Sequence, residues 1–120
     1  MKIDLDAFTR AYLICALWSS TGDDDRPLDD DHDIDDIDPD CITEAVADCA
    51  AFQRDNAADL EAQGGDAERN GHDFWLTRNS HGAGYWDRGT GEVGERLSKA
   101  AKVYGEAYLY VGDSGMVHIG

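Results

Sequence analysis

The chain has 120 residues and carries 26 acidic and 10 basic residues, a formal net charge of −16 at pH 7. This length fits one domain with its own core, so we predict a single domain over residues 1–120. No run of about 18 apolar residues exists, and residues 11–18, the most apolar stretch, lack the basic flank of a secretory signal. We therefore expect a cytoplasmic protein without a membrane span.

The negative charge is concentrated in one half of the chain. Residues 1–66 hold 19 acidic and 4 basic residues, whereas residues 67–120 hold 7 and 6. Eleven of the eighteen residues in 23–40, "DDDRPLDDDHDIDDIDPD", are aspartate. Adaptation to high salt would acidify the whole exposed surface, so the uneven distribution favours a localised acidic surface with a function. A salt-adapted source remains an alternative that also fits the composition. We expect an acidic helical half (1–66) and a near-neutral half (67–120).

Two helices are predicted in the acidic half. Apolar residues recur at helical spacing over residues 5–20, and a second helix begins at Asp38-Pro39, a capping residue followed by proline, and runs to about Gln63. Between them, Leu28, Ile34 and Ile37 are expected to hold the aspartate segment against the body.

Strand signals dominate the second half. Residues 72–78 and 84–88 are predicted to be strands, residues 90–105 a helix, and residues 106–111 and 116–119 a hairpin around "GDSG". The expected fold class is therefore α+β, with two N-terminal helices followed by ββαββ and a small antiparallel sheet.

No metal or cofactor site is predicted. The three cysteines form no CxxC pair and are interpreted as small apolar residues of a reducing cytoplasm. The calcium-binding loop motif needs glycine at its sixth position. A loop starting at Asp33 has Asp38 at that position, and a loop starting at Asp29 has Ile34.

The aspartate segment resembles a polyanion in charge density. Fully extended, it would carry a carboxylate about every 5.5 Å, against a phosphate about every 3.4 Å along one DNA strand. A protein that binds DNA through lysine and arginine would be attracted to it; a solvated acidic loop is the alternative. The candidate contact residues for such a partner are Asp23, Asp24, Asp25, Asp29, Asp30, Asp31, Asp33, Asp35 and Asp36.

Residues 71–88 combine histidine, aromatic and arginine side chains. His72, Asp73, His81 and Asp87 are of types that serve as ligands or acid–base groups, but their spacing matches no known catalytic or metal motif, so we predict no catalytic residue. The expected role is a structural hairpin whose arginines pair with acids. A candidate secondary surface on it consists of His72, Trp75, Arg78, His81, Trp86 and Arg88.

"HDFWLTRN", "HGAGYWDRG" and "GEVGERLSKAAKVYGEAYLYVGDSG" together resemble a family of small acidic proteins encoded by phages and prophages. The family usually reads HDFWLTRN-x-HGAG-F-WDR, and this chain has Tyr85 in place of the phenylalanine. The resemblance covers nearly the whole chain and implies a setting, the cytoplasm of an infected or lysogenic bacterium. It brings no catalytic residues with it.

In that setting, small acidic proteins often occupy the nucleic-acid sites of host defence enzymes. We therefore expect a non-enzymatic inhibitor of anti-CRISPR or anti-restriction type, which mimics nucleic-acid charge on a basic host protein and binds no nucleic acid itself. The alternative is an accessory phage protein of replication or gene control that acts through residues 72–88.

Overall fold

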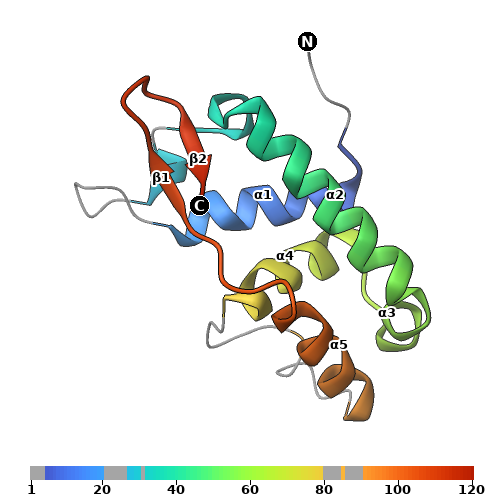
Figure 1. Cartoon of the computed structure of the whole chain (residues 1–120). Helices are drawn as coiled ribbons and strands as arrows, with labels where there is room; N and C mark the ends of the chain where they lie inside the picture. Colours follow the sequence, from blue (N-terminus) through green and yellow to red (C-terminus); the bar gives the residue numbers. More distant parts are fainter. Residues whose placement is uncertain (1–4, 21–26, 31, 80–84, 86–90) are drawn as a thin grey trace.

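The computed structural model describes residues 5–20, 27–30, 32–79, 85 and 91–120. Within these ranges the chain forms five α-helices, two short 3-10 helices and one two-stranded sheet (Figure 1). The described part is thus mostly helical, and the predicted α+β fold with ββαββ order is wrong.

The first two helices of the acidic half begin at local capping signals. In α1 (Ala7–Ser19), the side chain of Asp6 accepts a hydrogen bond from the Thr9 backbone N–H over 2.8 Å. In α2 (Pro39–Asp55), Asp38 caps the helix and Pro39 occupies its first turn, as predicted. The second predicted helix is in fact two, because the φ of −123° at Asn56 separates α2 from α3 (Ala57–Gln63).

Residues 72–78, predicted to be a strand, form the C-terminal part of α4 (Ala67–Arg78). The strand prediction rested on aromatic and β-branched residue types, whose preference is weak compared with tertiary context. All residues of 73–78 are buried. A helix satisfies its backbone hydrogen bonds internally and can lie at the centre of the molecule, whereas a strand there would need paired neighbours. Of the second predicted strand, residues 84–88, the structure describes only Tyr85, which is buried.

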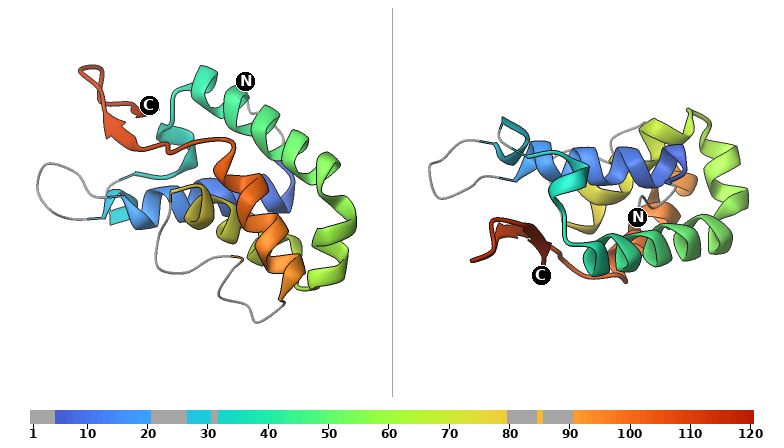
Figure 2. Two further views of the ribbon diagram at one scale, coloured as in Figure 1. Left: turned by 60° about the horizontal axis from the view of Figure 1, so that its bottom comes forward. Right: turned by 90° about the horizontal axis from the view of Figure 1, so that it is seen from above.

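The C-terminal elements agree with the sequence. Helix α5 (Glu92–Lys102) lies inside the predicted segment, and β1 (Leu109–Val111) pairs antiparallel with β2 (Val117–Ile119) around the predicted turn. The hairpin lies at the opposite end of the helical body from α3 (Figure 2). None of the described helices is long and apolar enough to cross a membrane.

The core is built on a close contact between α1 and α4. A Cβ atom added at Gly71 would lie 2.0 Å from the backbone oxygen of Phe8, so only glycine permits this approach. Aromatic rings fill the space around it, with Phe52 of α2 stacked on Phe74 of α4 at 4.2 Å between ring centroids. Trp75, with 1% of its surface exposed, donates from Nε1 to Ser19 Oγ over 2.8 Å.

Candidate functional site

The aspartate segment is folded onto the body of the protein. Its described residues form η1 (Leu28–Asp30) and η2 (Ile34–Asp36). Leu28 and Ile37 are buried in the core and Ile34 packs against it, which confirms the expected role of these three side chains. Ile37 also forms an isolated parallel bridge with Val117 of β2.

The carboxylates of this segment point outward. Asp29, Asp30, Asp33 and Asp35 are exposed, and Asp36 keeps 47% of its side chain exposed. We call these five residues the acidic face. Of the other predicted contact residues, Asp23, Asp24, Asp25 and Asp31 lie outside the described residues.

Two members of the acidic face also hold its local structure. The side chain of Asp33 accepts from the Asp35 backbone N–H, and that of Asp36 accepts from the Asp33 N–H, both over 2.9 Å. The side chains of Asp29, Asp30 and Asp35 have no hydrogen-bond or ion-pair partner within the described ranges. These three carboxylates are therefore free to meet a partner.

The described sequence around the acidic face carries little positive charge, with His32 lying 3.8 Å from Asp36. Residues 27–53 contain ten acidic residues and neither lysine nor arginine. Asp40 and Glu44 continue the exposed charge into the first turns of α2. Such a surface attracts cationic partners at long range, and the attraction falls as salt is added.

The structure describes three of the six predicted members of the secondary surface, and two of these three are buried. Trp75 and Arg78 are buried, while His72 is half-exposed beside Trp18, with 6.1 Å between ring centroids. The other three predicted members, His81, Trp86 and Arg88, lie outside the described residues.

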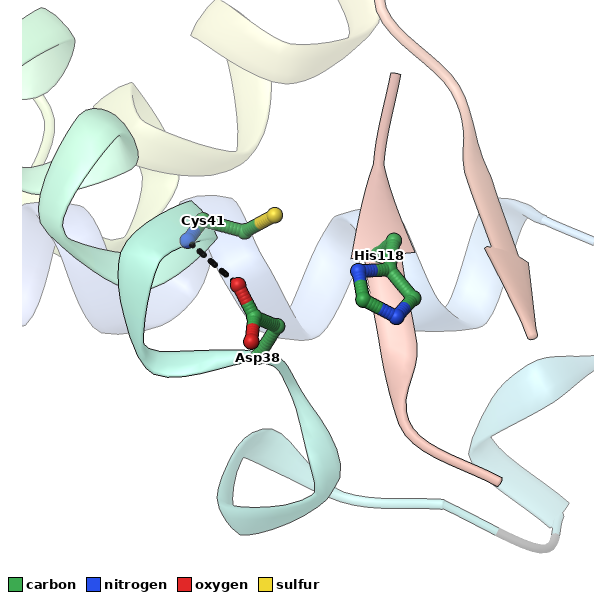
Figure 3. Close-up of side chains that lie close together, drawn as sticks. All are labelled: Asp38, Cys41 and His118. Atoms are coloured by element: carbon green, nitrogen blue, oxygen red, sulfur yellow. Dashed lines mark hydrogen bonds between the residues drawn. The ribbon is translucent and has the colours of Figure 1, made fainter. Parts of the chain in front are cut away.

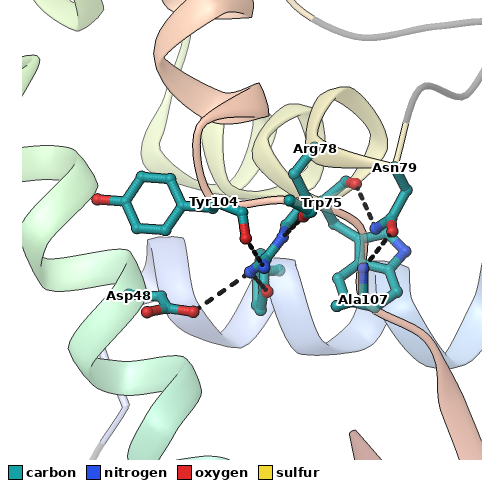
Figure 4. A network of polar contacts seen from close by, with 8 residues as sticks. Asp48, Trp75, Arg78, Asn79, Tyr104 and Ala107 are labelled. Atoms are coloured by element: carbon teal, nitrogen blue, oxygen red, sulfur yellow. Dashed lines mark hydrogen bonds and ion pairs between the residues drawn. The ribbon is translucent and has the colours of Figure 1, made fainter. Parts of the chain in front are cut away.

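Arg78 serves instead as an internal clamp (Figure 4). Its guanidinium donates to the Tyr12 hydroxyl over 2.8 Å and to the backbone oxygens of Tyr104 and Gly105, over 2.9 Å each. It also forms an ion pair with Asp48 of α2 at 3.3 Å, which confirms the predicted pairing of this arginine with an acid. Burial raises the pKa of Tyr12 far above its ordinary value, although the nearby Arg78 charge opposes the shift.

Two of the four possible acid–base groups, His72 and Asp73, lie within the described residues. His72 and Asp73 are consecutive on α4, where Asp73 is completely buried. Burial, followed by the charge of Asp73, raises the pKa of the Cys15 thiol to about 12, which removes its nucleophilic form at neutral pH. His81 and Asp87 lie outside the described residues.

In the described part of the chain, histidine, cysteine and carboxylate ligand atoms come together in one group of three. Asp38 and Cys41 of the α2 N-terminus and His118 of β2 have ligand atoms within 4.8 Å of one another, and each residue is half-buried. The sequence prediction missed this group, because Asp38 was interpreted as a cap and Cys41 as a small apolar residue. No local signal connects them to a histidine near the other end of the chain.

Comparison with protein-family models, with curated proteins and with solved structures gives no match for this chain.

Proposed function

We propose that the chain is a non-enzymatic interaction protein whose acidic face binds a basic, nucleic-acid-binding protein. The observation that carries this proposal is the outward display of five aspartates between residues 29 and 36 on a segment pinned to the core by Leu28 and Ile37. A flexible acidic loop would lose conformational entropy on binding, whereas a pinned one has already lost much of it.

The charge pattern favours a partner whose usual ligand is a nucleic acid. A site that holds DNA presents rows of lysine and arginine to closely spaced phosphates. The acidic face presents exposed carboxylates on short side chains within eight consecutive positions of the chain, so it offers such a site a concentrated negative charge. The partner class that we propose is a host defence protein, with the chain acting as an anti-CRISPR or anti-restriction inhibitor in the bacterial cytoplasm. This setting rests on the phage-family resemblance.

The alternative, an accessory phage protein acting through residues 72–88, receives less support. Two of the three described members of its proposed surface, Trp75 and Arg78, are engaged inside the core. A partner that used them would have to disrupt the contact between α1 and α4.

The test compares two variants that each lose three charges. The face variant is Asp29→Asn/Asp30→Asn/Asp35→Asn, which removes the carboxylates without local partners. The control variant removes three exposed charges outside the acidic face: one in α3, one in the segment before β1 and one in the hairpin turn. Its changes are Glu61→Gln, Glu106→Gln and Asp113→Asn.

Each protein is used as bait in nuclease-treated bacterial lysate at low salt, and the captured proteins are challenged with duplex DNA. We expect the wild-type and control baits to capture a basic protein that DNA or added salt displaces, and the face variant to lose it. Equal capture by the face variant and wild type at low salt would contradict the proposal, as would a captured protein that DNA fails to displace.

A further inference from the structure

The side chains of Asp38, Cys41 and His118 converge where the start of α2 meets the C-terminal hairpin (Figure 3). Asp38 is the N-cap of α2, Cys41 lies in its first turn, and His118 is the central residue of β2. Figure 3 shows one ring nitrogen of His118 turned towards the carboxylate and the sulfur. Three different ligand types from two elements thus face one another within 4.8 Å.

Backbone hydrogen bonds on both sides of His118 fix this convergence. The Asp38 N–H donates to the oxygen of Val117 over 2.8 Å, and the Ile119 N–H donates to Cys41 Sγ over 3.4 Å. The residues before and after His118 are therefore tied to the two other members of the group. Burial raises the pKa of the Cys41 thiol, and the Ile119 N–H that points at the sulfur opposes this shift, as outer-shell donors do at metal sites.

The ring of His118 is held in place from its other sides. It stacks on Tyr110 of β1 at 5.4 Å between ring centroids. A Cβ atom at Gly112 would lie 2.7 Å from His118 Nε2 and Cδ2, so this edge of the ring lies against the glycine backbone. Nδ1 is thereby left as the nitrogen that faces Asp38 and Cys41.

A thiolate, an imidazole and a carboxylate are together the ligand set of Zn²⁺ and similar borderline transition metals. Bond lengths of about 2.0–2.3 Å place the ligand atoms of a tetrahedral zinc site about 3.3–3.8 Å apart. Separations of at most 4.8 Å therefore need to close by roughly 1 Å, which side-chain rotation supplies. The neighbouring acidic face favours the approach of any divalent cation.

We propose that Asp38, Cys41 and His118 form a transition-metal site of the zinc class, with three protein ligands and a fourth position open. Metal binding would release the thiol proton to solvent and join the start of α2 to the hairpin. Water or a ligand from another molecule would occupy the fourth position. The site is separate from the proposed function, because the three free carboxylates of the acidic face take no part in it.

The test uses the full reduced chain, stripped of metal by a chelator and titrated with Co²⁺. We expect one equivalent to produce a thiolate-to-cobalt charge-transfer band and intense tetrahedral ligand-field bands, which Zn²⁺ abolishes by displacement. Cys41→Ser should lose the charge-transfer band. Asp38→Asn and His118→Gln should each weaken Co²⁺ binding at least tenfold. Asparagine at position 38 keeps a side chain that can cap α2.

Two controls separate this site from loose binding by acidic residues. His32→Gln changes a histidine beside the acidic face, and the face variant removes three of its charges; both should keep the band. If no thiolate band forms, or if it forms unchanged in His118→Gln or Asp38→Asn, the proposal is wrong.

A measurement on the unmodified chain covers the case in which a variant fails to fold. Zn²⁺ should slow alkylation of Cys41 by iodoacetamide, while the same concentration of Mg²⁺ or Ca²⁺, which prefer oxygen ligands, should not. Unchanged alkylation with Zn²⁺, or equal slowing by Mg²⁺, would also overturn the proposal.

Discussion

Arg78 of α4 donates a hydrogen bond from Nη1 to the hydroxyl of Tyr12 of α1 over 2.8 Å, inside the core. The same guanidinium reaches Asp48 of α2 and the chain after α5, so one side chain joins four parts of the fold. The Phe74 and Tyr104 rings flank it, at 5.9 and 5.8 Å from their centroids to the guanidinium carbon. This arginine belongs to the architecture rather than to a binding surface.

We expect Arg78→Met to lower the free energy of unfolding by about 2–3 kcal/mol, because it leaves buried acceptors without a charged donor. Arg78→Lys should recover only part of the loss, since an ammonium lacks the planar fork that reaches several acceptors. Asp48→Asn should cost less than about 1 kcal/mol, because 41% of that side chain is exposed. Urea unfolding followed by circular dichroism measures all three, and a neutral Arg78→Met would contradict the clamp.

Gly71 gives a second stability test. Gly71→Ala should destabilise the protein by several kcal/mol, because its Cβ would overlap the Phe8 carbonyl and force α1 and α4 apart. In an ordinary helix the same change would stabilise by about 0.5–1 kcal/mol. Glu68→Ala, at an exposed position of the same helix, should stay within about 0.5 kcal/mol of wild type. A stabilised Gly71→Ala variant would show that the two helices do not pack this closely.

The elements with local signals could be predicted from the sequence. The start of α2 carries a capping aspartate and a proline at neighbouring positions, and the C-terminal hairpin carries a turn between two short apolar runs, so both were found. Helix α4 was missed because its aromatic residues suit a strand equally well. The burial of all residues of 73–78, which decides between helix and strand, depends on packing against α1, α2 and α5 and cannot be read from the local sequence.

Of the two candidate sites, the acidic face could be predicted from the sequence and the group of Asp38, Cys41 and His118 could not. The acidic face could be predicted because charge density is a property of composition, and its three apolar anchors stand out in an aspartate run. The meeting of Asp38, Cys41 and His118 depends on where the last strand docks, so no spacing rule predicts it. Trp75 and Arg78 were assigned to a candidate surface because tryptophan and arginine side chains are suited to binding, whereas α4 buries every residue of 73–78.

Two buried tyrosines predict how the protein responds to alkali. Burial, followed by the charge of Asp73, raises the pKa of Tyr85, and burial raises that of Tyr12. The folded state therefore keeps these protons at a pH where the unfolded chain, with an ordinary value of about 10, releases them. Their contribution to stability is complete below about pH 10 and is lost above it, at about 1.4 kcal/mol per pH unit for each group.

We expect a pH titration to show part of the tyrosinate absorbance appearing only together with the loss of the circular dichroism signal. Tyr85→Phe removes one of the two groups and its 2.6 Å hydrogen bond to the Asn70 backbone oxygen. It should make the decline of stability above pH 10 less steep. Complete ionisation of all five tyrosines in a protein that still has its folded spectrum would contradict this prediction.

The acidic face should cost the folded protein stability. Asp29, Asp30 and Asp35 are exposed like charges in a region without lysine or arginine, and none has a partner within the described ranges. Their mutual repulsion is relieved when the chain unfolds and expands. We therefore expect the face variant to unfold at a higher urea concentration than wild type in about 0.01 M salt, where charges interact over about 30 Å. The difference should vanish near 1 M salt, where charges interact over only about 3 Å.

Asp33→Ala is the control for this prediction. It removes one charge but also the hydrogen bond that the Asp33 side chain accepts from the Asp35 N–H, so it separates the two roles of aspartate in this segment. If only charge mattered, this variant would gain about one third of the free energy of unfolding that the triple face variant gains. We expect a smaller gain or a loss, because removing a capping side chain costs about 0.5–2 kcal/mol. A face variant less stable than wild type at low salt would mean that these carboxylates hold the segment together and are not free for a partner.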